Sequence, residues 1–190
     1  MSKKVIVGIT GRTGSGKSHA CKWINDNINN VEHIDCDQVG HNVLEMPDVK
    51  QELIKIFGKE IEENGKINRS KLGGIVFSSK DKLMSLNEIV HPKICEIVKN
   101  TIKSTNNSVI IIEGALIHQV GLEHVCNYTI CIDSPTKTIL ERRPDKEIIL
   151  TKQPKANDYI NMCTHTIKNN TSIELFEKKI GQVLSRININ

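Results

Sequence analysis

A set of residues near the start of the chain has the types and the spacing of a phosphate-binding loop. Gly11, Gly16, Lys17 and Ser18 fit the pattern G-x-x-x-x-G-K-[ST] within the segment GITGRTGSGKS. In this pattern backbone N–H groups surround phosphate oxygens, the lysine reaches the β- and γ-phosphates, and the serine hydroxyl ligates Mg²⁺. We expect the lysine to face solvent. The residues expected to bind nucleotide are Gly11, Thr13, Gly14, Ser15, Gly16, Lys17, Ser18 and His19.

The residues on either side of the loop predict a strand before it and a helix after it. The apolar run from Val5 to Ile9 is typical of a buried parallel strand. Ala20, Cys21, Ile24 and Ile28 recur with the spacing of one helix face. This order puts the positive end of a helix dipole at the anion site, which favours nucleotide binding over a plain glycine-rich turn.

Two carboxylates, Asp35 and Asp37, lie at the C-terminal end of the next predicted strand, Val31 to Asp35. Open α/β folds bind ligands at the C-terminal ends of their strands, and phosphoryl transfer to a hydroxyl needs metal-bound phosphates and a carboxylate to accept the proton. We expect Asp37 to act as the base and Asp35 to join the Mg²⁺ shell. On an extended strand end the two side chains would point the same way. The alternative for either residue is a capping role for a helix that starts near Gln38.

Composition limits the classes of protein that the chain can represent. With 190 residues it suits one domain with a sizeable core, and its formal charge of +4 suits anionic small molecules without indicating nucleic acid. Neither a signal peptide nor a run long enough to span a membrane is evident, so we expect a cytoplasmic protein without a membrane partner. Its six cysteines are scattered and lack a C-x-x-C pair, which favours buried free thiols over a disulfide framework.

The middle of the chain, from Gln38 to about Thr105, is predicted to be helical and to lack strands. Its first clear helix has an apolar face and ends at Gly58. Asn64-Gly65 marks a turn, and Pro92 is expected to bend or break a long helix. The face of that first helix consists of Val49, Leu53, Ile56 and Phe57.

Strand signals resume in the last part of the chain. The short runs Ser108 to Gly114, Tyr128 to Asp133 and Thr164 to Asn169 alternate with helix-length segments, which predicts a parallel sheet covered on both faces. Thr171 and Glu174 have the spacing of a capping box before the last helix. The apolar stripe of that helix consists of Phe176, Ile180, Val183, Leu184 and Ile187.

Several segments together resemble the dephospho-CoA kinase family over nearly the whole chain: GITGRTGSGKS, DCDQVGH, NGKINRSKLGGIVF, LNEIVHPKI and TIKNNTS. The resemblance implies an α/β fold of the P-loop NTPase type, with three α/β/α layers and a five-stranded, mainly parallel sheet. It implies a single kinase domain over residues 1–190. The core would be about 1–37, 106–137 and 161–190, with a helical acceptor-binding insertion at about 38–105 and a short lid at about 138–160.

The same resemblance implies the activity and the residues that bind the acceptor. The reaction would transfer a phosphoryl group from ATP, with Mg²⁺, to the ribose 3′-hydroxyl of dephospho-CoA, in a monomer or weak homo-oligomer. His41, Arg69, His91 and Glu113 correspond to acceptor-binding positions, and Asp35 is expected to contact the acceptor as well as the metal ion. Glu113 stands where the family has aspartate in D-x-P-L-L-F-E. Ala115 and Gln119 replace the proline and the final glutamate of that segment.

The segment LERRPDKEIILTKQPKANDYI resembles a shortened form of the family's lid. Arg143, with Arg142 as the alternative, would stabilise charge at the transferred phosphoryl group, and Gln153 matches a family glutamine. The plain alternative for both arginines is solvated charge at a helix end. Other functions consistent with the motifs are a nucleoside or nucleotide kinase and a nucleotide-binding protein with weakened catalysis.

Overall fold

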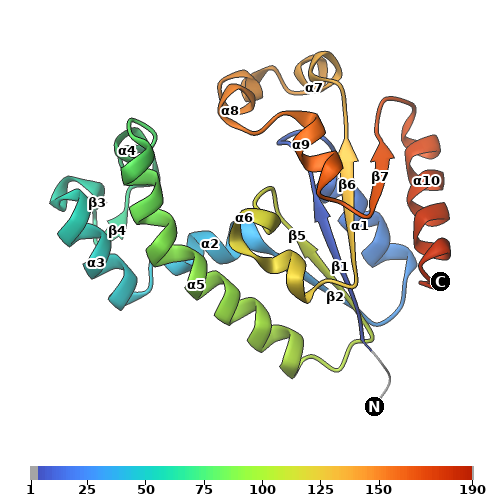
Figure 1. The fold of residues 1–190 in the computed structure, drawn as a ribbon, viewed down its shortest axis with the longest axis horizontal. Helices are drawn as coiled ribbons and strands as arrows, with labels where there is room; N and C mark the ends of the chain where they lie inside the picture. Colours follow the sequence, from blue (N-terminus) through green and yellow to red (C-terminus); the bar gives the residue numbers. More distant parts are fainter. Residues whose placement is uncertain (1–3, 190) are drawn as a thin grey trace. The chain divides into compact units, whose positions relative to one another are not determined.

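A five-stranded parallel sheet organises the part of the chain that carries the glycine-rich loop. A computed structural model describes residues 4–189, which fall into two units. The first unit extends to Asp35 and resumes at Ser104, and the second unit is Cys36–Lys103. Figure 1 labels the helices and strands of both units.

The sheet has the strand order β2-β5-β1-β6-β7. β1 lies at its centre, so the loop that follows β1 leaves the sheet between neighbouring strands. β5 is buried along its whole length, as expected for a strand that is covered on both faces. The strands are β1 (Val5–Thr10), β2 (Val31–Asp35), β5 (Val109–Glu113), β6 (Tyr128–Asp133) and β7 (His165–Lys168). The predicted strands of the first unit are thereby confirmed.

One face of the sheet packs against α1 (Lys17–Asn27) and α10 (Ile173–Arg186). Alternate residues of each strand point to this face, because successive side chains of a strand lie on opposite sides. Ile9, Ile111 and Ile132 join Ile24 of α1 and Phe176 of α10 in one buried cluster. The predicted apolar stripe of the last helix is therefore confirmed as core.

The opposite face is covered by short elements. Ile110 and Ile112 of β5 point to this side and are fully buried. Ile117 of α6 (Ile117–Val120) and Leu122 of the 3₁₀ helix η2 (Leu122–Val125) are buried as well, and η2 contacts β1. The predicted arrangement of helices on both faces of a parallel sheet is confirmed (Figure 1).

The start of α10 differs from the sequence prediction. Ser172, and not Thr171, is the N-cap residue, and its hydroxyl accepts a hydrogen bond from the backbone N–H of Leu175 at 3.4 Å. Both hydroxyl residues can cap a helix, so the type of residue alone does not choose between them. The path of the chain from β7 to α10 decides where the helix begins.

Short helices connect β6 to β7. They are α7 (Thr136–Arg142), the 3₁₀ helix η3 (Pro144–Lys146), α8 (Glu147–Lys152) and α9 (Ala156–Asn161). Ile139 and Leu150 are buried, whereas Ile148 is 72% exposed. We call residues 138–160 the lid, as in the sequence analysis.

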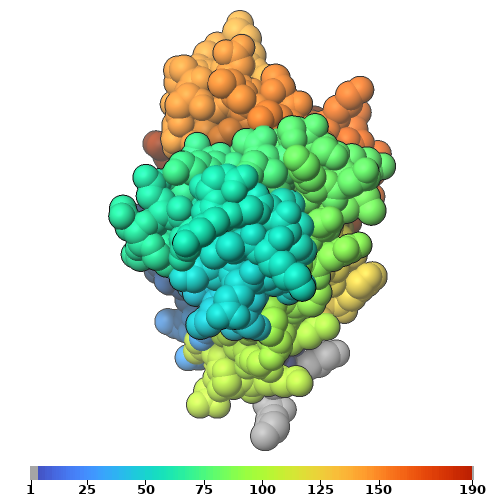
Figure 2. All heavy atoms as spheres, turned by 90° about the vertical axis from the view of Figure 1, so that its left-hand side faces the viewer, coloured from blue at the N-terminus to red at the C-terminus, as the bar shows by residue number. Residues whose placement is uncertain are grey.

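The second unit consists mainly of helices, and Figure 2 shows the surface of these helices in cyan and green. They are α2 (Cys36–Leu44), α3 (Pro47–Phe57), α4 (Arg69–Val76) and α5 (Lys80–Ser104), with a short 3₁₀ helix η1 (Lys59–Ile61) after α3. As predicted, α3 ends at Gly58. Ile56 was expected on its buried face but is 49% exposed, whereas Val49, Leu53 and Phe57 are buried.

A small hairpin in the second unit was not predicted. β3 (Glu62–Glu63) and β4 (Lys66–Ile67) are antiparallel, so the expectation of a block without strands is wrong. The predicted turn at Asn64-Gly65 is confirmed, because both residues have positive φ angles of 51° and 75°. Such a pair is the preferred two-residue connection of a hairpin. Strands of two residues leave too short an apolar pattern to detect in a sequence.

Pro92 does not end α5, which runs unbroken from Lys80 to Ser104. A proline inside a helix costs about 3 kcal/mol, because it removes a hydrogen bond and crowds the preceding turn. Val90, Ile94 and Val98 are buried on both sides of it. Burial of a side chain of this size contributes about 1.5–3 kcal/mol, so the three together outweigh the cost of the proline.

All six cysteines are free thiols, as predicted. Cys21, Cys36 and Cys131 are buried, whereas Cys95, Cys126 and Cys163 are only partly buried. Of the helices in residues 4–189, none combines the length and the apolar character that a membrane span needs.

Candidate active site

The glycine-rich loop joins β1 to the N-terminus of α1. Gly11 and Gly16 have φ angles of 137° and 107°, a region that side chains with a Cβ rarely adopt. A Cβ at Gly11 would meet the carbonyl oxygen of Ile132, and a Cβ at Gly16 would meet the side-chain amide of Asn169. These glycines therefore let the loop backbone approach its neighbours closely.

Lys17 is buried within this loop, contrary to the expectation that it faces solvent. Only 8% of the residue is exposed. Its ammonium group donates hydrogen bonds to the carbonyl oxygens of Gly11 at 3.1 Å and Arg12 at 3.2 Å. The loop thus holds a positive charge against its own backbone, and phosphate oxygens would be alternative partners for it.

Ser15 offers a further polar group inside the loop. Its hydroxyl oxygen is buried and makes no hydrogen bond with any residue in the part of the chain that the structure describes. A buried polar atom without a hydrogen bond lowers the stability of the folded protein, so we expect this hydroxyl to gain a partner when a ligand binds. A phosphate oxygen in the loop would supply that partner.

Arg12 fixes the loop to the segment after β6. Its guanidinium group donates to the hydroxyl of Thr136 at 2.8 Å and to the carbonyl oxygen of Ser134 at 2.7 Å. These residues are more than a hundred positions away along the chain. Arg12 was not predicted as a site residue, because the loop pattern leaves its position unspecified.

Two amide side chains from the C-terminal half also hold the loop. The backbone N–H of Thr13 donates to Gln153 Oε1 at 2.8 Å, which links the loop to the lid. Asn169 Nδ2 donates to the carbonyl oxygen of Ser15 at 2.8 Å, in a buried contact. Gln153 was noted in the sequence only as a family match, and Asn169 only as part of the segment TIKNNTS.

Glu113, at the end of β5, lies beside the loop. Its Oε1 accepts a hydrogen bond from the hydroxyl of Ser18 at 2.7 Å, and its Oε2 is 3.0 Å from Nε2 of His33. Burial raises the pKa of Glu113, but the hydrogen bonds from His33 and Ser18, with a smaller contribution from the nearby Cys21 thiol, outweigh burial and hold the pKa below its usual value. An ionised carboxylate therefore faces the serine that the loop pattern assigns to Mg²⁺.

Asp35 shares the edge of the sheet with Glu113. The two residues are register partners in the parallel pair of β2 and β5, so they lie on the same face at the C-terminal ends of these strands. Asp37 differs from the prediction, because it lies in the first turn of α2 and not on an extended strand end. An acidic residue in a first helical turn also interacts favourably with the helix dipole.

The lid arginines have different partners. Arg143 forms a bidentate ion pair with Asp145, with both hydrogen bonds at 3.0 Å. This pair raises the pKa of Arg143 and lowers the pKa of Asp145. Arg142 lies 3.5 Å from the carbonyl oxygen of Asn169, near the residue that holds the loop. The fold thus brings Arg142 toward the loop's support, and Arg143 is occupied by a neighbouring aspartate.

His19 was expected to bind nucleotide, and the structure gives it a protein partner. Its Nε2 lies 2.9 Å from Glu177 Oε1, and its ring centroid is 5.9 Å from that of Phe176. Both partners belong to α10. In this arrangement His19 connects α1 to α10.

Three of the expected acceptor residues belong to the second unit, whereas Asp35 and Glu113 belong to the first. His41 lies in the last turn of α2, Arg69 is the first residue of α4, and His91 lies in α5. The side chain of Asn68 caps α4 by accepting hydrogen bonds from the N–H groups of Ser70 and Lys71. This cap fixes the backbone from which Arg69 projects.

Comparisons with known proteins agree on one family. The model of the dephospho-CoA kinase family matches residues 5–174. A dephospho-CoA kinase of Fusobacterium nucleatum subsp. nucleatum is 31% identical over 192 residues, which cover 96% of this chain and 98% of that relative. One of Borrelia garinii subsp. bavariensis is 32% identical over 196 residues, which cover 96% of this chain and 94% of that relative.

Solved structures support the fold. The Thermus thermophilus protein TT1252 has a TM-score of 0.81 and 23% identity, with 98% of this chain and 99% of that chain covered. A dephospho-CoA kinase from Campylobacter jejuni has a TM-score of 0.70 and 23% identity, with 96% of each chain covered. A shikimate kinase from Bacteroides thetaiotaomicron has a TM-score of 0.58 and 14% identity, with 97% and 99% covered. Because the family model and the relatives match nearly the whole chain, this protein belongs to the dephospho-CoA kinase family.

Proposed function

We propose that the glycine-rich loop, Glu113 and the carboxylates after β2 carry out the reaction of this family, the ATP-dependent phosphorylation of dephospho-CoA to coenzyme A. One observation carries the proposal. The ionised Glu113 accepts a hydrogen bond from Ser18 at 2.7 Å, beside a loop in which Lys17 is held by backbone carbonyls. The site thus combines an anion cradle with an acidic group in the arrangement that nucleotide phosphates and a metal ion require.

The loop would bind the triphosphate of ATP. Lys17 exchanges its carbonyl partners for phosphate oxygens, and the hydroxyl of Ser15 gains the partner that it lacks. The first backbone amides of α1 would donate hydrogen bonds to the same anion. They are available for it because no side chain among residues 4–189 caps this helix. The glycines keep the backbone close to the phosphates.

The oxygens of Ser18, Glu113 and Asp35 fit Mg²⁺, which prefers oxygen ligands and retains several of its waters. Ser18 would hold the ion directly, with the two carboxylates in contact with it or with its waters. When bound, Mg²⁺ neutralises charge on the phosphates during transfer. Glu113 would also orient the serine hydroxyl, so that its lone pairs are available to the ion.

Asp37 would accept the proton of the ribose 3′-hydroxyl. In the chain Asp37 is the second residue after β2, and α/β folds bind ligands at the C-terminal ends of their strands, which supports this role. His41, Arg69 and His91 would contact the anionic acceptor. A guanidinium group such as that of Arg69 suits bidentate contact with phosphate.

The lid would complete the site. Arg143, with Arg142 as the alternative, would stabilise charge at the transferred phosphoryl group. Arg143 must leave Asp145 to do so. The pair is exposed to solvent, where ion pairs contribute little to stability, so breaking it would need little free energy. Free thiols at all six cysteines suit a reducing compartment, and we place the reaction in the cytoplasm.

Product analysis tests the acceptor. The protein is incubated with Mg²⁺, ATP and one acceptor at a time: dephospho-CoA, a set of nucleosides, or a set of nucleoside monophosphates. We expect ADP and coenzyme A from dephospho-CoA alone. Faster turnover of a nucleoside or its monophosphate would identify a nucleotide kinase, and ATP binding without any product would identify a binding protein.

A pair of variants tests the carboxylate roles. Asp37→Asn keeps the size of the side chain but removes the base, so we expect kcat to fall by about 10²–10⁴-fold with ATP binding unchanged. Asp35→Asn should weaken apparent Mg²⁺ affinity, and added Mg²⁺ should restore part of the rate. If Mg²⁺ rescues Asp37→Asn and not Asp35→Asn, the two roles are exchanged.

A further inference from the structure

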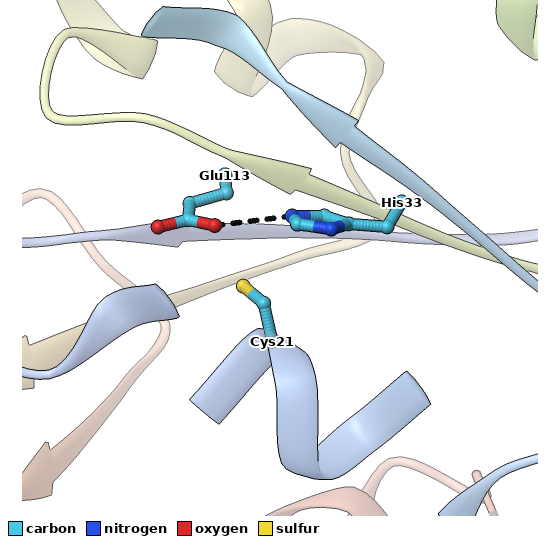
Figure 3. A group of neighbouring side chains, drawn as sticks. All are labelled: Cys21, His33 and Glu113. Atoms are coloured by element: carbon cyan, nitrogen blue, oxygen red, sulfur yellow. Dashed lines mark hydrogen bonds and ion pairs between the residues drawn. The ribbon is translucent and has the colours of Figure 1, made fainter. Parts of the chain in front are cut away.

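Three side chains of different chemistry converge beside the phosphate loop. Cys21 of α1, His33 of β2 and Glu113 of β5 each place one possible ligand atom within 4.8 Å of the other two. Figure 3 shows the sulfur of Cys21 directed toward the Glu113 carboxylate, and the His33 ring bonded to the same carboxylate. The proposed phosphoryl transfer uses Glu113 but has no role for the thiol or the imidazole.

The fold itself produces this convergence. β2 and β5 are parallel, with His33 opposite Ile111 and Asp35 opposite Glu113 in the register. His33 and Glu113 therefore point to the same face, and Ile111 on that face packs in the cluster that includes α1. Cys21 projects from α1, and its sulfur lies within 4.8 Å of the ligand atoms of His33 and Glu113.

We propose that Cys21, His33 and Glu113 form a binding site for a thiophilic divalent cation of the zinc class. Thiolate sulfur, imidazole nitrogen and carboxylate oxygen are the ligands that Zn²⁺ accepts in proteins. Mg²⁺ prefers oxygen ligands, so this set selects a different ion from the one expected at Ser18. Binding converts the Cys21 thiol to a thiolate, and the proton passes to the buffer.

The present spacing is close to that of an occupied site. Tetrahedral zinc with ordinary bond lengths keeps its ligand atoms roughly 3.3–3.8 Å apart. His33 Nε2 and Glu113 Oε2 are already 3.0 Å apart, so the cation would replace the hydrogen bond between them. The proton on Nε2 would pass through solvent to Nδ1, which leaves a neutral imidazole with Nε2 free to bind the cation. The remaining separations, at most 4.8 Å, need only a small side-chain shift.

The proposed site is open to solvent at His33, and a fourth ligand could bind the cation there. The His33 side chain is 31% exposed, whereas that of Glu113 is 8% exposed. A cation can enter past the imidazole and keep one water molecule as its fourth ligand. Sites with three protein ligands and a water are common for zinc.

The site shares a side chain with the machinery of phosphoryl transfer. Glu113 Oε1 accepts from Ser18, and Oε2 faces His33. A dication on Oε2 would neutralise the carboxylate that supports Mg²⁺ at Ser18, so bound zinc should inhibit the kinase. This consequence rests on the proposed function, whereas the binding site does not.

Metal binding is measured first, on the whole chain without ATP or dephospho-CoA. Co²⁺ replaces Zn²⁺ as a spectroscopic probe, because a thiolate ligand gives a charge-transfer band in the near ultraviolet and tetrahedral coordination gives intense visible bands. Competition with a chelating dye then gives Zn²⁺ affinity. The variants are Cys21→Ser and His33→Gln, with Cys131→Ser as control for an equally buried thiol.

We expect one equivalent of Co²⁺ to give the thiolate band in wild type and in Cys131→Ser, and no band in Cys21→Ser. Loss of a direct ligand should weaken Zn²⁺ binding in Cys21→Ser and His33→Gln by more than the roughly 10–100-fold that changes in outer contacts cost. His33 is partly exposed, so we expect His33→Gln to fold. This variant therefore still tests the site if Cys21→Ser unfolds. Wild-type affinity in His33→Gln, or a Co²⁺ band that survives in folded Cys21→Ser, would overturn the site.

Inhibition provides a second, separable readout. At fixed Mg²⁺ and ATP, Zn²⁺ should inhibit coenzyme A formation by wild type and Cys131→Ser at concentrations about tenfold or more below those needed for Cys21→Ser. Equal inhibition of all three would overturn the link to catalysis. A protein that binds the cation as proposed but makes no coenzyme A would refute the proposed function and leave the metal site intact.

Discussion

The phosphate loop and the lid differ in how the fold holds them. The loop is bonded to distant parts of the chain: Ser18 to Glu113, Arg12 to Thr136, and Ser15 to Asn169 at a separation of 154 residues. In the lid, Arg143 is bonded to Asp145, only two residues away. Long-range bonds position the loop within the sheet, whereas Arg143 of the lid is held by a residue two positions away.

This difference fits the tasks that we propose for the two regions. A cradle for phosphates works best when its donors are in place before the nucleotide arrives. If residues 138–160 act as the proposed lid, they would change their contacts as substrates enter and products leave, which requires a weakly held segment. Ile148 and Ile149 of the lid are 72% and 44% exposed, which is consistent with few packing constraints there. Gln153 joins the two regions through its bond to Thr13.

The largest effect is expected from Lys17→Ala in the loop. Removal of the ammonium group should lower kcat by about 10²–10³-fold or more, because the charge acts directly on the transferred phosphate. The matched control is Lys22→Ala, which removes an exposed lysine from the same helix. Steady-state kinetics and thermal unfolding are measured together, since Lys17 is buried. Wild-type turnover in folded Lys17→Ala would refute the assignment of the loop.

Arg143→Ala tests the lid, with a somewhat smaller expected effect. Loss of the charge at the transition state should lower kcat by about 10²-fold, with little change in ATP affinity. The melting temperature should stay the same, because the residue is exposed. Arg142→Ala is the comparison. If Arg142→Ala lowers kcat more than Arg143→Ala does, Arg142 is the residue that acts.

Asn169→Ala tests the long-range support of the loop. This substitution leaves the buried carbonyl oxygen of Ser15 without its donor, so the free energy of unfolding should fall by about 1–3 kcal/mol. Asn170→Ala changes the neighbouring, exposed asparagine and serves as control. Urea unfolding measures stability, and ATP titration should show weaker binding in Asn169→Ala alone. Equal stability of the two variants would contradict the role given to this bond.

The smallest effect is expected from Asp145→Ala. The ion pair with Arg143 is solvent-exposed, so its removal should leave the melting temperature unchanged. Release of Arg143 should change kcat/KM by less than about fivefold, and an increase would show that the pair opposes closure of the lid. A large loss of stability would mean that the lid is held as firmly as the loop, and would contradict the difference between the two regions.

Local sequence patterns were sufficient for the five strands of the parallel sheet and for the nucleotide loop. The apolar run before the loop and the helical spacing after it predicted β1 and α1, because buried parallel strands and helix faces leave distinct periods in the sequence. The motif G-x-x-x-x-G-K-[ST] located the anion site because all of its residues are close together in the chain.

Predictions that depended on tertiary contacts were less successful. Pro92 lies inside an unbroken helix, because burial around it outweighs its local cost. Lys17 is buried, although a loop lysine alone suggests exposure. Asp37 is helical because α2 begins directly after β2, which no residue type in DCDQ specifies. In each case the local preference was weaker than the packing or the path of the chain.

The sequence by itself determined where the five strands of the parallel sheet lie along the chain, the phosphate loop and the family, because these are encoded in short patterns. Only the tertiary structure decided that Glu113 meets Ser18, that Asn169 supports Ser15, and that Cys21 and His33 share one carboxylate. Those contacts depend on which strands are neighbours in the sheet. Strand order is set by packing of the whole apolar core, so side chains far apart in the chain meet in ways that no local pattern specifies.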